Sequence, residues 1–152
     1  MMVELKVNGR PYRVEVAENE LLVDVLRYRL GFMGVKQGCG EGDCGLCLVL
    51  MNGRPVHSCL IPAWRADGSD IVTVEGIGSE TSLHPVQRAF IDQGAVQCGF
   101  CIPAAVLIGK WLLDRGLAGD RETVRWAYRG LLCRCGSYLR FEEAVAQASR
   151  GG

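Results

Sequence analysis

The spacing of eight cysteines limits what this chain can fold into more than any other feature of its sequence. They form a Cys-x4-Cys-x2-Cys group with one further cysteine, a Cys-x2-Cys pair and a Cys-x-Cys pair: Cys39, Cys44, Cys47 and Cys59, then Cys98 and Cys101, then Cys133 and Cys135. Disulfides are typical of secreted chains, and cysteines one or two residues apart are poorly spaced for structural bridges. The pattern indicates metal binding, with zinc and iron–sulfur clusters as the two candidates.

The first cysteine group has the spacing of a plant-type [2Fe–2S] ferredoxin loop, which a distant fourth cysteine completes. The predicted ligands are Cys39, Cys44, Cys47 and, as the obvious fourth, Cys59. The loop KQGCGEGDCGLC is also crowded with glycines, at Gly38, Gly40, Gly42 and Gly45. Glycine adopts φ > 0 freely and leaves backbone N–H groups able to point at cluster sulfurs. A flexible linker would not combine three thiols with the apolar run LCLVLM that follows.

Composition excludes several other classes of protein. Lys and Arg total 17, as do Asp and Glu, so no basic surface for nucleic acid is expected. The N-terminal segment MMVELKVNGRPYRVEV alternates apolar with polar residues, unlike a signal peptide, and no run approaches the roughly 18 apolar residues of a membrane span. A globular, cytoplasmic protein without a membrane span is therefore predicted.

Alternating apolar and polar residues predict β-strands in the first half of the chain. Two β-hairpins are expected around Asn-Gly pairs, one from segments 3–7 and 12–16 and one from segments 46–51 and 55–60. A closing strand is expected over 71–74. Between the hairpins, Asn19 is expected to cap a helix with one apolar face, formed by Leu22, Val25, Leu26 and Leu30. This half is predicted to be a small α+β domain over residues 1–78.

The second half, residues 79–152, has a helical pattern. The first helix is expected to follow Ser82 and end before Gly94, and the second to begin at Pro103 and end at Gly116. Asp120 is expected to cap a third helix that ends near residue 130, and the fourth should span 138–148. The short connections between them favour a four-helix bundle.

A second metal site follows from this topology. In an up-down-up-down bundle the first and third connections lie at the same end, and these connections contain Cys98 and Cys101, and Cys133 and Cys135. Two of these thiols lie where the second helix begins, where the N–H dipoles favour negative charge. An iron–sulfur cluster is favoured here, although the spacing alone leaves zinc open.

The motifs GVKQGCGEGDCGLC, QCGFC and CRC together resemble the small iron–sulfur subunit of the xanthine dehydrogenase, aldehyde oxidase and carbon monoxide dehydrogenase family of molybdenum hydroxylases. The resemblance extends from the first strand to about Ala148. It implies an α+β chain in which an N-terminal β-grasp 2Fe-2S ferredoxin-like domain precedes a C-terminal four-helix bundle domain. Each domain would hold one [2Fe–2S] cluster, on Cys39, Cys44, Cys47 and Cys59 in the first and on Cys98, Cys101, Cys133 and Cys135 in the second.

The resemblance also implies electron transfer within an oxidoreductase of several subunits. Substrate would be oxidised at a molybdopterin cofactor in a large subunit, and electrons would pass through the helical-domain cluster and then the ferredoxin-domain cluster. They would end on FAD in a medium subunit or on another acceptor. Gln97 and Cys135 match the family positions that lie against molybdopterin. No residue of this chain is expected to act catalytically on substrate.

The alternative function is that of a free-standing electron carrier with two clusters. A carrier that meets many partners benefits from a strongly acidic surface, whereas this chain has zero net charge, which favours the role of a subunit. A zinc-stabilised scaffold protein is a more remote alternative. His57 and His84 are expected to be solvated or hydrogen-bonded and not metal ligands, and Trp111 and Trp126 are expected to lie in the core.

Overall fold

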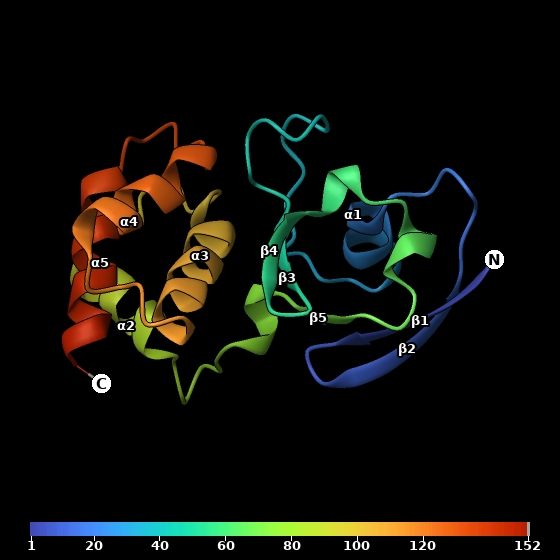
Figure 1. Ribbon diagram of the computed structural model, residues 1–152, viewed down its shortest axis with the longest axis horizontal. Coiled ribbons are helices and arrows are strands. Elements are labelled where there is room, and N and C mark those ends of the chain that lie inside the picture. Colours follow the sequence, from blue (N-terminus) through green and yellow to red (C-terminus); the bar gives the residue numbers. More distant parts are fainter. Residues whose placement is uncertain (152) are drawn as a thin grey trace.

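The computed structural model describes residues 1–151 and places a mixed β-sheet beside a group of helices (Figure 1). The sheet has five strands in the order β2-β1-β5-β3-β4, with β1 parallel to β5 and the other pairs antiparallel. The strands are β1 Met2–Val7, β2 Arg10–Glu15, β3 Leu48–Met51, β4 Arg54–His57 and β5 Asp70–Val72. The α-helices are α1 Leu22–Asp24, α2 Pro85–Asp92, α3 Ile102–Asp114, α4 Arg121–Ala127 and α5 Tyr138–Arg150. The α+β fold and the order of its two parts confirm the prediction.

Both predicted hairpins are present. Asn8 and Gly9 connect β1 to β2, and Asn52 and Gly53 connect β3 to β4, with positive φ at all four residues. Positive φ at both central residues is what a two-residue type I′ turn requires, which explains the Asn-Gly pairs. The second hairpin is shorter than predicted, because Ser58–Leu60 forms a 3-10 turn that brings Cys59 back toward the glycine-rich loop.

The predicted helix of the first half is also present, but its predicted cap is wrong. Helix α1 continues as a π-helical turn over Val25–Arg29, and the residue that precedes the helix is Leu21, not Asn19. Leu21 forms an isolated β-bridge with Pro62, and the N–H of Leu22 donates to the carbonyl of Ile61 at 2.8 Å. The carbonyl of Ile61 therefore accepts from an N–H group that would otherwise donate to a capping side chain.

Strand β3 separates two hydrophobic cores. Leu48 and Leu50 pack with the helices, whereas Val49 and Met51 pack with α1 and the other strands. Side chains alternate between the faces of a strand, so each core receives every second residue of β3. Helix α3 lies against the hairpin formed by β3 and β4 (Figure 1). The sheet and the helices are thus joined through a shared strand, and the proposed boundary between residues 78 and 79 lies in the segment from β5 to α2.

The four helices α2 to α5 match the predicted segments, with differences in detail. Asp120 caps α4 as predicted, accepting from the N–H of Thr123 at 3.1 Å. Helix α2 follows Ser82 as predicted and is capped by His84, whose Nδ1 accepts from the N–H of Val86 at 3.2 Å. Trp126 is 63% exposed, so its predicted place in the core is wrong. No helix within residues 1–151 has the length and apolar character needed to cross a membrane.

Candidate metal centres

The glycine-rich loop directs several backbone N–H groups at cysteine sulfur. The Sγ of Cys39 accepts from Glu41 at 3.4 Å and from Asp43 and Cys44 at 3.3 Å each, and the Sγ of Cys44 accepts from Cys39 at 3.3 Å. These N–H groups, with that of Cys44 contributing most, lower the pKa of the Cys39 thiol to about 7. The loop therefore stabilises negative charge on sulfur, which is the state that binds metal.

The glycines of this loop serve two different purposes. Gly40, Gly42 and Gly45 have φ between 72° and 80°, as predicted for a loop that turns its N–H groups inward. Gly38 does not have positive φ. A methyl group there would lie 2.8 Å from the Sγ of Cys44, so Gly38 is needed for the close approach of backbone to sulfur.

Cys47 and Cys59 complete the first set from the other side. Both are buried, and the Cys47 thiol is close enough to shift the pKa of Cys59. Burial first, and then the Cys47 thiol, raise the pKa of Cys59 to about 11. Ser58 holds the turn in place, because its hydroxyl donates to the carbonyl of Cys47 at 2.6 Å. The four sulfurs thus form two neighbouring pairs, Cys39 with Cys44 and Cys47 with Cys59.

The second cysteine set lies where the α2–α3 and α4–α5 connections meet. Cys101 and Cys133 are buried, and each thiol is close enough to shift the pKa of the other. Burial and the Cys133 thiol raise the pKa of Cys101 to about 12. Burial acts to raise the pKa of Cys133 too, but N–H groups of the α4–α5 connection and the Cys101 thiol outweigh it and the pKa is lowered. Cys98 is exposed and close enough to affect Cys101 electrostatically, and Cys135 is half-buried.

Both sets suit an iron–sulfur cluster by the chemistry of their donors. A [2Fe–2S] cluster spreads four thiolates over two irons, and each set supplies four cysteines. The neighbouring sulfur pairs and the inward N–H groups of the first loop fit that arrangement.

The two cysteine-bearing loops are in direct backbone contact. The N–H of Leu132 donates to the carbonyl of Cys44 at 2.8 Å. Beside this bond, Gly45 lies so close to the next chain segment that a methyl group on it would overlap the carbonyl oxygen of Gly130. Reasoning from sequence missed this contact, because it joins two backbone segments far apart in the chain and no side-chain pattern marks it.

Gln97 belongs to the α2–α3 connection, and its side chain reaches the α4–α5 connection at the second site. Its Nε2 donates to the Oγ of Ser137 at 3.1 Å and reaches the carbonyl of Cys135 at 3.5 Å. The structure therefore brings together the two residues, Gln97 and Cys135, that the sequence singled out for a cofactor contact. Gln97 is exposed, so its side chain is accessible from outside the chain.

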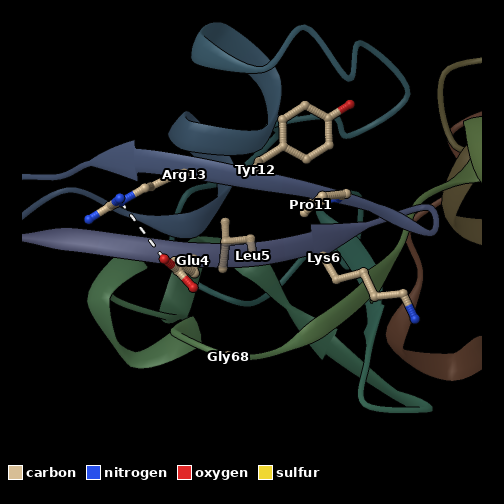
Figure 2. Close-up of a pocket in the computed structure, with 7 residues that line it drawn as sticks. All are labelled: Glu4, Leu5, Lys6, Pro11, Tyr12, Arg13 and Gly68. Carbon is tan, nitrogen blue, oxygen red and sulfur yellow. Dashed lines mark ion pairs between the residues drawn. The ribbon is translucent and has the colours of Figure 1, made fainter.

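Two hollows of the structure have no cysteine among their lining residues. His57 lines a cavity of about 230 Å³ between β4 and the helices, together with Trp111 and Trp126. A hollow of about 390 Å³ lies over β1 and β2, where Figure 2 shows the side chains of Leu5, Lys6 and Tyr12. None of its lining residues comes from a cysteine-bearing segment, so this hollow has no part in the metal sites.

Comparison with known proteins agrees with the two sites. A model described as "2Fe-2S iron-sulfur cluster binding domain" matches residues 5–73, and one described as "[2Fe-2S] binding domain" matches residues 73–146. The chain is 42% identical over 147 residues to a nicotinate dehydrogenase subunit of Pseudomonas putida, covering 97% of this chain and 94% of that protein. It is 40% identical to the nicotinate dehydrogenase small FeS subunit of Eubacterium barkeri, covering 96% and 93%.

Solved structures of related proteins have the same fold as this chain. The aldehyde oxidoreductase of Desulfovibrio desulfuricans superposes with a TM-score of 0.93 at 44% identity, covering 99% of this chain. This chain spans only 17% of that longer protein. Quinoline 2-oxidoreductase of Pseudomonas putida 86 superposes with a TM-score of 0.89 at 36% identity, and the match covers 100% of this chain and 97% of the chain compared.

Proposed function

Because this chain belongs to the family of small iron–sulfur subunits of molybdenum hydroxylases, we propose that it carries electrons from a large catalytic subunit to an acceptor. When bound, two [2Fe–2S] clusters supply one-electron oxidation and reduction. Cys39, Cys44, Cys47 and Cys59 would hold the first cluster. Cys98, Cys101, Cys133 and Cys135 would hold the second.

The observation that carries this proposal is the hydrogen bond from Leu132 to Cys44. It joins a proposed ligand of the first cluster to the residue before Cys133, a proposed ligand of the second. Electron transfer between two sites slows steeply as their separation grows, so an effective relay needs the sites held close and rigid. A backbone bond and the close packing of Gly45 on Gly130 support that role.

The residues around the first site would shield its cluster from water. Leu60 covers the tip of the loop, since a methyl group on Gly42 would lie 2.5 Å from its Cδ1. Cys44, Cys47 and Cys59 are all buried. Limited access of water and fixed N–H donors are two of the factors that set the potential of such clusters.

The surface around the second site supports docking of a large subunit. Large apolar side chains flank Cys98, Cys133 and Cys135 and are exposed by 45–70%: Val96, Phe100, Leu132 and Leu139. A concentration of exposed apolar side chains is typical of a surface that a partner covers. We place the large subunit there, with its molybdopterin against Gln97 and Cys135.

A medium subunit with FAD would accept the electrons on the side of the first site. We also place the complex in the cytoplasm, because eight free cysteines suit a reducing compartment. The substrate would be an aldehyde or an N-heteroaromatic compound, since the matched proteins include aldehyde oxidoreductases, nicotinate dehydrogenases and quinoline 2-oxidoreductase.

The test is to purify the tagged chain anaerobically from its native host. About four irons and four acid-labile sulfides per chain are expected, together with a larger molybdenum-containing protein in a fixed ratio. Nicotinate, quinoline and a simple aldehyde then serve as the substrate panel. A chain that elutes alone with both clusters, while hydroxylase activity elutes elsewhere, would instead support a free-standing carrier.

A further inference from the structure

Lys36 is a half-buried cation that has no acidic partner within the part of the chain that the structure describes. The ion pairs of residues 1–151 involve other basic side chains, namely Lys6, Arg13, Arg29, Lys110, Arg121 and Arg125. The ammonium of Lys36 lies instead over the ring of Phe100, 5.7 Å from its centroid. A cation at that distance is attracted by the ring, and the contact fixes where the charge lies.

This contact connects the two cysteine sites. Lys36 precedes Cys39 by three residues, and Phe100 lies between Cys98 and Cys101. The backbone that leads to Lys36 is held by Arg27, whose guanidinium donates to the carbonyls of Met33 at 2.7 Å and Val35 at 3.0 Å. The charge of Lys36 is therefore anchored in the first half of the chain and positioned beside the loop of the second.

We propose that Lys36 is a positioning residue for electron transfer that raises the reduction potential of the helical-domain cluster. The inference rests on the cluster assignment of the proposed function. A [2Fe–2S] cluster with four thiolates is negatively charged, and reduction adds one more electron. A fixed cation nearby stabilises the reduced form more than the oxidised form, and the effect is stronger where the cation is partly removed from water.

The other charged side chains close to the cysteines are not held over the Phe100 ring. Glu41 and Asp43 belong to the first loop, and Arg134 lies between two cysteines of the second set, but none of the three lies over the Phe100 ring as Lys36 does. Water and salt screen exposed charges, whereas a half-buried charge is screened less. Docking of a partner on Phe100 would remove Lys36 further from water and would strengthen its effect.

The test uses the assembled enzyme with Lys36→Met, which removes the charge and keeps an unbranched side chain of nearly the same length. Lys36→Gln is a second neutral variant in case the methionine alters packing. At a fixed potential, each is expected to raise the ratio of oxidised to reduced helical-domain cluster about tenfold, equal to about 59 mV for one electron. The measurement is a redox titration followed by electron paramagnetic resonance, with iron content determined for each variant.

Two controls separate a role of charge from a role in structure. Lys36→Arg keeps the cation and is expected to restore the midpoint potential. Lys6→Met removes a lysine that pairs with Asp70 on the sheet, and is expected to leave both potentials unchanged.

Unchanged midpoint potentials in both neutral variants, with both clusters present, would overturn this inference and leave the relay intact. The same shift in Lys36→Arg as in Lys36→Met would also overturn it, because it would assign the effect to packing. A wild-type chain without a helical-domain cluster would overturn the cluster assignment of the proposed function, and this inference with it.

Discussion

At the scale of single residues, two glycines with similar backbone geometry have different surroundings. Gly45 and Gly53 have φ of 75° and 76°, a region that other residues enter with strain. A methyl group on Gly53 would meet nothing within 4 Å, whereas one on Gly45 would overlap the carbonyl of Gly130. Substitutions at these two glycines therefore distinguish the cost of backbone strain from the cost of disturbing the packing between the two cysteine loops.

Gly45→Ala is expected to destabilise the chain by about 1–3 kcal/mol more than Gly53→Ala, because both add left-handed strain but only the first overpacks the contact between the loops. Chemical unfolding followed by tryptophan fluorescence measures the difference. Equal losses of unfolding free energy in the two variants would show that the contact between Gly45 and Gly130 contributes nothing to stability.

Asp120 gives a pH-dependent prediction at the same scale. The hydroxyl of Thr123, and then its N–H, lower the pKa of this carboxyl below its ordinary value. A lowered folded-state pKa contributes stability above the unfolded pKa, and this contribution is lost as the pH falls through the folded pKa. Asp120→Asn keeps a capping side chain that does not ionise. The stability advantage of the wild type over Asp120→Asn, measured by urea unfolding, should therefore be constant above about pH 5 and should narrow as the pH falls below about 4. An advantage that stays the same from about pH 5 to about pH 3 would contradict the role of the Asp120 carboxylate as a charged cap.

At the scale of elements, local patterns predicted the hairpins and helices well, because Asn-Gly turns, Pro85 and Asp120 act within their own segments. The cap at Asn19 was mispredicted, and no cap was predicted for α2, because both ends are satisfied by groups that the local pattern does not mark. A neighbouring turn satisfies α1, and the imidazole of His84 caps α2. Trp126 was mispredicted because apolar spacing on a helix does not distinguish a core position from an exposed one.

Strand β3 contributes side chains to both hydrophobic cores, so a change in it should affect both halves of the chain. Leu50 is 4% exposed and packs in the core of the helices, although it belongs to the sheet. Leu50→Ala is expected to cost about 2–4 kcal/mol. Because β3 belongs to both cores, calorimetry should show a single transition that moves to lower temperature as a whole. Leu139→Ala, at a side chain 70% exposed, is the control and should change little. Two separate transitions in the Leu50 variant would contradict the shared-strand account.

At the scale of the whole molecule, cysteine spacing predicted two sites, since the order of the ligands and the lengths of the loops can be read from the sequence. The assignment of the eight ligands stays a prediction. The contact between the sites was not predictable in that way. The bond from Leu132 to Cys44 and the position of Lys36 over Phe100 depend on how the two halves pack. In the proposed relay, these contacts hold the two cysteine loops together.

The central claim is that both sites on this chain receive electrons from substrate. Freeze-quenched electron paramagnetic resonance of the assembled enzyme, mixed without oxygen with each member of the substrate panel, tests it most directly. For the compound that is oxidised, two distinct [2Fe–2S] signals are expected to appear within one turnover, and the helical-domain signal is expected first. Substrate oxidation at the full rate while both clusters stay oxidised would contradict the account.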